Sequence, residues 1–192
     1  MDSRPEQLRR MQKEKSTKWD MLSFAVIFSA LILRMSYFGF EYHRQLDDYI
    51  QYHNFARTGD PMRLIMTEGL FAARPLAAVF DLYIWGQMPL YISAVILSCM
   101  YAAAGVIFMR LFRKHFSTGF FFVVFFSLLP LGFEGTYWIS ASARILPPLF
   151  FGAMAQAVLD RFCESKKWWR IPLFLVLCLL SLDSTSRYWC CR

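Results

Sequence analysis

The segment from Leu90 to Phe112 is 23 residues long and carries no charge before Arg110. As a helix it would be about 34 Å long, which is enough to cross a hydrocarbon core of roughly 30 Å. A helix that is apolar on every side needs either lipid or a large surrounding protein. A chain of 192 residues is too short to supply the second. The segment therefore favours a membrane-spanning helix over the core helix of a soluble all-helical protein.

Further apolar runs lie on both sides of this segment, at residues 21–38, 118–133, 145–162 and 168–182. The run at 145–162 has Pro147 and Pro148 near its start, and proline is tolerated in the first turn of a helix. The last run would form only about 22 Å of helix, which is short of a hydrocarbon core. We therefore expect this last run to pack poorly and residues 183–192 to be an unstructured tail.

The composition agrees with a lipid environment. Hydrophobic residues make up 57% of the chain and aromatic residues 18%, while charged residues make up 18% against roughly 25% in soluble domains. A net charge of +7 would raise the question of nucleic acid in a soluble protein. Here the lysines lie in short polar segments at the ends of apolar runs, so no nucleic acid partner is predicted. The sequence predicts an all-α polytopic integral membrane protein of about five transmembrane helices, with residues 1–192 as a single transmembrane domain.

The distribution of Lys and Arg predicts the orientation of these helices. Residues 1–20, 110–115 and 160–170 together contain 13 of the 21 basic residues. Residues 39–88 and 132–145 form the alternate segments, which are longer in total but contain five, all Arg. Because basic residues concentrate in cytoplasmic loops, residues 1–20 are predicted to be a cytoplasmic N-terminal segment and residues 39–88 an extracytoplasmic loop.

This loop is predicted to contain short surface helices, one at 49–57 and one that begins at Pro75 and runs to about residue 85. Asp47 and Asp48 stand directly before the first of them. A carboxylate at this place could act as a general base toward an acceptor hydroxyl, or could hold a divalent metal ion. Equally, an Asp before a helix caps free amides and complements the helix dipole without any catalytic role. The spacing leaves both alternatives open.

Two arginines, Arg74 and Arg144, each stand shortly before a proline that is predicted to start a helix. A cation there opposes the positive end of the helix dipole, so helix stability does not explain it. Together with free helix amides, each arginine could bind a phosphate or pyrophosphate. The alternative is that each guanidinium snorkels outward to the lipid headgroups.

The second predicted outer loop contains Glu134 and Trp138, with Tyr137 between them. A carboxylate beside two aromatic rings could meet a sugar, because aromatic faces pack against the apolar faces of sugar rings. Trp and Tyr are also the residues that collect at membrane interfaces. A sugar contact and an interfacial belt are therefore both compatible with this loop.

One span followed by Leu-Asp-Asp-Tyr at 46–49, at the opening of a long outer loop, resembles the C-type (GT-C) membrane glycosyltransferases. Ala-Arg-Pro-Leu at 73–76 and the stretch 134–144 resemble their O-antigen glucosyltransferase branch. The resemblance implies transfer of a sugar from a polyprenyl-phosphate donor to a glycan or lipid acceptor outside the cytoplasm. It implies that Asp47 or Asp48 is the base or the metal ligand, with a divalent cation as the cofactor that these residues could hold. It further implies a bacterial cytoplasmic membrane, with membrane lipid, the polyprenyl-linked sugar and the acceptor as partners.

The resemblance covers nearly the whole chain but only the N-terminal portion of such an enzyme. We therefore expect a truncated or frame-altered product. The alternative class is a non-enzymatic polytopic protein, such as half of a transporter or a scaffold subunit. Transporters place ionisable groups near the middle of the bilayer, whereas the predicted spans are nearly free of charge and Arg34 lies close to an outer end. The sequence names neither the sugar nor the acceptor.

Overall fold

The computed structural model describes residues 4–37, 75–80, 88–116, 118–128 and 139–185, and the following account concerns these residues. Their regular structure is entirely helical. The helices are α1 (Arg4–Tyr37), α5 (Pro75–Phe80), α6 (Leu90–Phe112), α7 (Phe120–Leu128), α9 (Ile139–Ser165) and α10 (Arg170–Thr185). The predicted all-α fold class is confirmed for this part of the chain.

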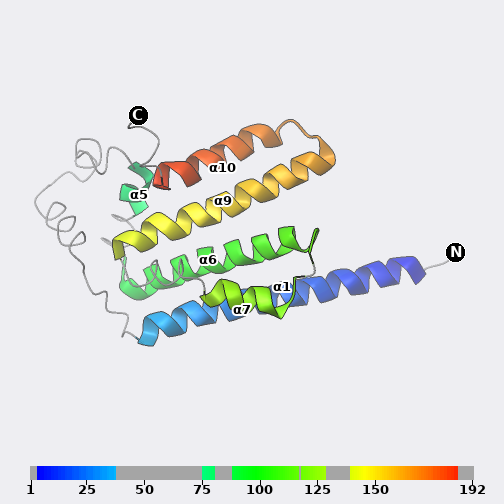
Figure 1. The fold of residues 1–192 in the computed structure, drawn as a ribbon, viewed down its shortest axis with the longest axis horizontal. Coiled ribbons are helices and arrows are strands. Elements are labelled where there is room, and N and C mark those ends of the chain that lie inside the picture. The colour runs from blue at the N-terminus through cyan, green and yellow to red at the C-terminus, as the bar shows by residue number, and fades with distance from the viewer. Residues whose placement is uncertain (1–3, 38–74, 81–87, 117, 129–138, 186–192) are drawn as a thin grey trace, which may run out of the picture.

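The long helices lie side by side (Figure 1). Helix α9 lies between α10 and α6, and α6 lies between α9 and α1; α6 and α9 run in the same direction, whereas α1 and α10 run in the opposite one. Helix α7 packs against both α1 and α6, and the short α5 lies beside α9 and α10. With these directions, the N-terminal part of α1, the α6–α7 turn and the α9–α10 turn all lie at one end of the bundle.

Helix α6 is the central element, and small residues let its neighbours approach closely. Ser93, Ala94, Ser98, Ala102 and Ala104 are fully buried along it. Small residues at helix contacts are typical of helices that pack in membranes. The larger side chains of the core come from several helices; they are Ile27, Leu31, Leu97, Tyr101, Met109, Val123, Phe126 and Leu146.

The contact between α6 and α7 is fixed by a tyrosine. The Tyr101 hydroxyl donates a hydrogen bond to the backbone carbonyl of Phe126 at 2.5 Å, and the two rings stack with their centroids 4.7 Å apart. A buried hydroxyl normally requires such a partner. This bond therefore makes the polar tip of Tyr101 compatible with its complete burial.

Most of the predicted helix positions agree with the structure. Helix α6 has the predicted bounds, and α5 begins at Pro75 as predicted. Helix α1 begins much earlier than the predicted apolar run, because the preceding segment is rich in Arg, Lys, Glu and Gln, all good helix formers. Of the predicted run at 118–133, residues 120–128 form α7, and residues 129–133 lie outside the described part.

The predicted start of the fourth helix is wrong. Helix α9 begins at Ile139, so Pro147 and Pro148 lie in its interior rather than in its first turn. Leu146 and Pro147 are completely buried there. Neighbouring helices can compensate for the backbone hydrogen bonds that a proline removes. Tertiary packing has therefore overridden the local tendency of proline to start a helix.

The expectation that the last run packs poorly is also wrong. Helix α10 packs along α9, where the Ser181 hydroxyl donates to the backbone carbonyl of Pro148 at 2.9 Å. Gly152 permits this approach, since a Cβ at that position would lie 3.2 Å from the Ser181 oxygen. The helix continues to Thr185, three residues into the predicted unstructured tail, and residues 186–192 lie outside the described part. A helix too short to cross a bilayer alone is thus held by its neighbour.

The turn between α9 and α10 is formed by a left-handed residue and an arginine. Lys166 has a φ of 53°, and its N–H donates to the carbonyl of Phe162 at 2.7 Å, which is the αL type of helix termination. The Arg170 guanidinium then donates to the carbonyl of Arg161 and to the Ser165 hydroxyl. These bonds tie the start of α10 to the last turn of α9.

Candidate functional site

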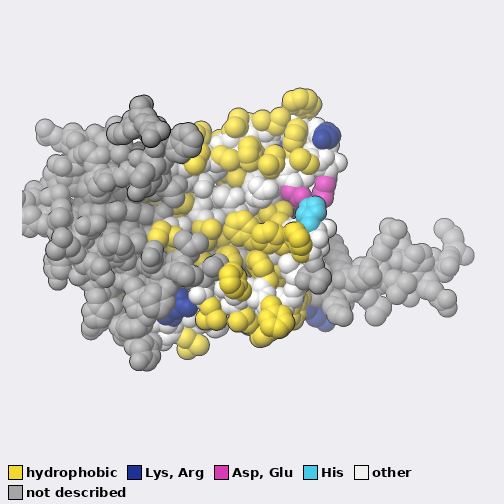
Figure 2. All heavy atoms as spheres, in the orientation of Figure 1, with side chains coloured by type: hydrophobic (Ala, Val, Ile, Leu, Met, Phe, Trp, Pro, Cys, Tyr) yellow, Lys and Arg dark blue, Asp and Glu magenta, His cyan; other side chains and the backbone are white. Residues whose placement is uncertain are grey.

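The outer faces of the helices expose large apolar side chains. Phe121 is 88% exposed, Leu33 67% and Leu179 66%. Two described helical segments are long and apolar enough to cross a bilayer, Ser16–Ser36 and Leu90–Phe112, and Arg170–Leu182 is apolar but shorter. In Figure 2 hydrophobic side chains cover the middle of the visible face, and acidic, basic and histidine side chains gather at its right-hand end. This separation marks the charged end as the polar site of the described structure.

A buried carboxylate joins α1 to the end of α6. Asp20, whose side chain is only 7% exposed, accepts a hydrogen bond from the Arg110 Nε at 2.8 Å and another from the Arg113 Nη1 at 2.9 Å. Charge-assisted bonds of this kind are stronger than neutral ones. One Asp therefore neutralises part of the charge of two guanidinium groups at this end.

A second ion-pair cluster joins the α6–α7 turn to α9. The Lys114 ammonium donates hydrogen bonds to Asp160 and to Glu164, which stand one helical turn apart on α9. The bonds to Asp160 and then to Glu164 raise the pKa of Lys114 above its usual value. Lys114 consequently keeps its proton near neutral pH, so it is suited to link the two helices and unsuited to act as a nucleophile or base.

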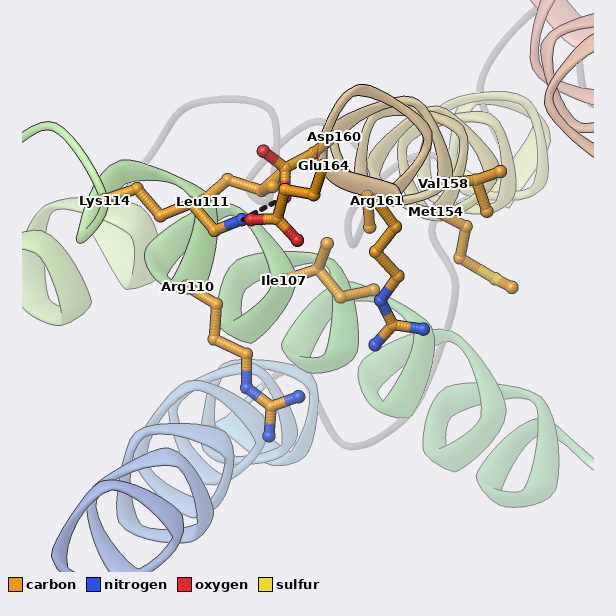
Figure 3. A pocket seen from close by; sticks show the side chains of 10 residues that line it. Ile107, Arg110, Leu111, Lys114, Met154, Val158, Asp160, Arg161 and Glu164 are labelled. Atoms are coloured by element: carbon orange, nitrogen blue, oxygen red, sulfur yellow. Dashed lines mark hydrogen bonds and ion pairs between the residues drawn. The ribbon is translucent and has the colours of Figure 1, made fainter. Parts of the chain in front are cut away.

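A cavity of about 440 Å³ lies between α6 and α9 beside this cluster (Figure 3). Its apolar wall and its charged rim are formed by Ile107, Arg110, Leu111, Lys114, Met154, Ala157, Val158, Asp160, Arg161 and Glu164. Figure 3 shows Lys114 reaching toward Glu164, Arg110 pointing toward α1, and Arg161 extending from α9 toward α6. The cavity can therefore take a molecule that has both an apolar and a charged part.

This cavity was not predicted from the sequence. The sequence predicts basic segments at 110–115 and 160–170, but it predicts no roles for the carboxylates Asp20, Asp160 and Glu164. The signal in the sequence is that Asp20 directly precedes the first apolar run and that Asp160 and Glu164 stand at the end of the fourth. Such a charge is costly near lipid unless it is paired, so each of these carboxylates implied a basic partner on another helix.

The sequence-predicted site residues lie almost entirely outside the described part, namely Asp47, Asp48, Arg74, Glu134 and Trp138. The backbone of Arg144 belongs to α9, and its side chain is not described. Because α9 begins at Ile139, Arg144 does not stand before the first turn of this helix, and the argument from free amides no longer applies to it. Among the described residues, no group of three His, Cys, Asp or Glu side chains could hold a metal ion.

No family model, curated protein or solved structure matches this chain. Its function is therefore argued from its own residues.

We expect the substitution Asp20→Asn to lower the free energy of unfolding by about 1 to 2 kcal/mol, because hydrogen bonds to charged groups contribute roughly 1.5 to 3 kcal/mol and Arg110 is partly exposed to solvent. The measurement is unfolding of the purified protein in detergent micelles, followed by circular dichroism. Glu164→Gln is the control, since Glu164 is largely exposed and exposed pairs contribute about 0 to 1 kcal/mol. Equal losses for the two variants would show that the buried carboxylate has no special structural role.

Proposed function

We propose that this chain is an integral membrane protein whose charged end lies at the cytoplasmic surface. The observation that supports it is the set of exposed Phe, Leu and Val side chains along the outer faces of the helices, together with the ion pairs that gather at one end of the bundle. Water-exposed apolar patches of this extent are rare on soluble monomers. Lipid would cover these side chains, and the ion pairs would meet the headgroup region.

The proposed orientation follows from the basic residues. In the described structure, Lys18, Arg113 and Lys114 lie at the same end of the bundle as the turn that contains Lys166 and Lys167. An excess of Lys and Arg on one side of a membrane protein indicates the cytoplasmic side. The N-terminus is therefore assigned to the cytoplasm.

At the other end of the bundle we propose a glycosyltransferase site. Helix α1 ends there and α6 begins there, so both ends of the segment 38–87 lie away from the ion pairs. This agrees with an extracytoplasmic loop that presents Asp47 or Asp48 to an acceptor hydroxyl or to a divalent cation. Arg74 would meet the phosphate of a polyprenyl-linked donor, Arg144 in the second turn of α9 would add a guanidinium without free helix amides, and Glu134 and Trp138 would meet a sugar.

The support for this reaction is the resemblance to the GT-C enzymes, together with the start of α6 and of α9 at the same end of the bundle. Helix α9 begins at the same end of the bundle as α6, and α7 runs toward that end, with its Phe126 carbonyl beside Tyr101 in the middle of α6. The segment 129–138 therefore leads to the end of the bundle at which the segment 38–87 meets α6. The residues proposed for the acidic, phosphate and sugar sites thus belong to segments on one side of the bundle. The class of reaction is transfer of a hexose from a polyprenyl phosphate to a glycan or lipid outside the cytoplasm.

The orientation predicts different labelling of two engineered cysteines. In a background without native cysteine, Gln51→Cys should react with an impermeant thiol reagent added to intact cells, whereas Lys166→Cys should react only after the cells are opened. The expected difference is about tenfold or more in labelled fraction, because the bilayer excludes the reagent from one side. Equal labelling of both positions in intact cells would contradict the proposed topology.

A further inference from the structure

The cavity between α6 and α9 has an apolar wall at one side and a charged rim at the other. Ile107, Leu111, Met154 and Val158 supply the apolar wall. A volume of about 440 Å³ is within the range of sites that hold small molecules. The walls therefore fit an amphiphile better than a wholly polar ligand.

Of the charges at the rim, the guanidinium of Arg161 is the one available to a ligand. Lys114 is hydrogen-bonded to both carboxylates of the rim, and Arg110 is paired with Asp20. Arg161 makes no ion pair with any carboxylate in the described part of the chain. Its side chain extends from α9 over the cavity toward α6 (Figure 3). A planar guanidinium in such a place binds phosphate with two parallel hydrogen bonds.

The charge of the site favours an anionic ligand. The rim contains three cations and two carboxylates, so its net charge is positive, and Lys166, Lys167 and Arg170 follow close by in the sequence. A ligand ammonium group would have to compete with Lys114, which already engages Asp160 and Glu164. A zwitterionic headgroup is therefore disfavoured relative to an anionic one.

The cavity lies at the level where a lipid headgroup would meet this protein. Helix α6 ends at Phe112, immediately beyond the lining residues Arg110 and Leu111, and the charged residues of α9 begin at Asp160. Basic pockets between transmembrane helices on the cytoplasmic side are suited to acidic headgroups. A lipid chain that enters from the surrounding bilayer can reach the apolar wall without crossing water.

We propose that this cavity binds one anionic phospholipid, with the phosphate on Arg161 and an acyl chain against Ile107, Leu111 and Val158. The proposal rests on the proposed membrane location and is independent of the transferase reaction. Bound there, the lipid would add a bridge between α6 and α9 to the one that Lys114 already forms.

The test uses the purified chain in detergent, with phosphatidylglycerol or phosphatidylcholine added and the bound lipid counted by native mass spectrometry. The parent chain should bind phosphatidylglycerol about tenfold more tightly than phosphatidylcholine. Arg161→Gln should weaken phosphatidylglycerol binding about tenfold or more, since it removes a charge-assisted contact. Lys167→Gln removes the same charge from the adjacent turn without altering the cavity lining, and it should change binding less than twofold.

A second pair of variants tests the apolar wall. Ala157→Phe places a ring in the cavity and should displace the lipid while Arg161 is retained, whereas Gln156→Phe places a ring on an exposed, non-lining position of the same helix and should not. An excess of glycerol phosphate should not displace the lipid, because it lacks the acyl chain. Displacement by glycerol phosphate at a concentration comparable with that of the lipid would assign the site to a free phosphate instead.

Equal weakening by Arg161→Gln and Lys167→Gln, or retention of the lipid by Ala157→Phe, would overturn the proposal. Alkaline carbonate extraction of membranes that contain the parent chain tests the membrane location separately from the lipid site. Release of the chain by carbonate would contradict the membrane location. Retention of the chain together with equal binding of both phospholipids would contradict the lipid site alone.

Discussion

Membranes that contain Asp47→Asn should transfer sugar about 100-fold to 10,000-fold more slowly than membranes with the parent chain, the loss typical of removing a general base. Asn caps a helix about as well as Asp, so the local structure should be retained. The substitution removes only the negative charge that base or metal chemistry requires. Transfer of a radiolabelled sugar from polyprenyl phosphate, at matched protein levels, is the measurement.

Asp48→Asn is the matched control for this experiment. Successive positions of a helix lie about 100° apart, so two adjacent carboxylates should not face one reaction site equally. We expect one variant, Asp47→Asn as first choice, to lose most of the activity and the other to lose a few-fold. If neither variant loses more than a few-fold, the pair is a helix cap and the transferase proposal loses its main residue-level support.

The second large effect is expected in the core, at Gly105 in the middle of α6. A Cβ added there would lie 2.8 Å from the Ile27 Cδ1 atom and 2.8 Å from the Phe126 ring. These side chains come from α1 and α7, so a larger side chain at this position must displace the Phe126 ring and the end of the Ile27 side chain. Gly105→Leu should lower the free energy of unfolding by about 3 kcal/mol, the upper part of the usual range for an overpacked core.

Unfolding in mixed micelles with increasing sodium dodecyl sulfate, followed by circular dichroism, measures this loss. Gly119→Leu is the control, because a Cβ at Gly119 meets no atom within 4 Å. Leu is also a better helix former than Gly by somewhat under 1 kcal/mol, which offsets part of the loss at Gly105 but does not reverse it. Identical unfolding curves for Gly105→Leu and the parent chain would show that α1, α6 and α7 do not pack as closely as described.

The two substitutions also distinguish a loss of helix packing from a loss of the proposed catalysis. Gly105 lies in the helical core, so Gly105→Leu tests the packing of three helices and should reduce every activity in proportion to the folded fraction. Asp47 is proposed to act in the reaction, and Asn retains the shape of the side chain, so Asp47→Asn should leave the unfolding curve close to that of the parent while the rate of transfer falls. A variant that lost both properties at position 47 would indicate a structural role for its carboxylate.

Several features of the fold follow from the sequence because they depend on neighbouring residues alone. The bounds of α6 coincide with an apolar run whose length matches a bilayer, and α5 begins at Pro75, where proline suits the first turn. Residues 110–115 and 160–170 lie at the same end of the bundle, as expected when α6, α7 and α9 run in alternating directions along the chain. Each of these predictions needs only local composition and the rise of a helix per residue.

Other features depend on residues that are distant in the sequence, and only the tertiary structure decides them. Asp20 is separated by 90 residues from Arg110, and Lys114 by 46 residues from Asp160. The interior prolines of α9 and the docking of the short α10 likewise depend on burial against neighbouring helices. The length of an apolar run sets where a helix can form, whereas the pairing of charges and the shape of the cavity depend on which faces of two helices meet. Packing decides which helix faces meet, through contacts such as those of Gly105 with Phe126 and of Gly152 with Ser181. No single segment of the sequence specifies this arrangement.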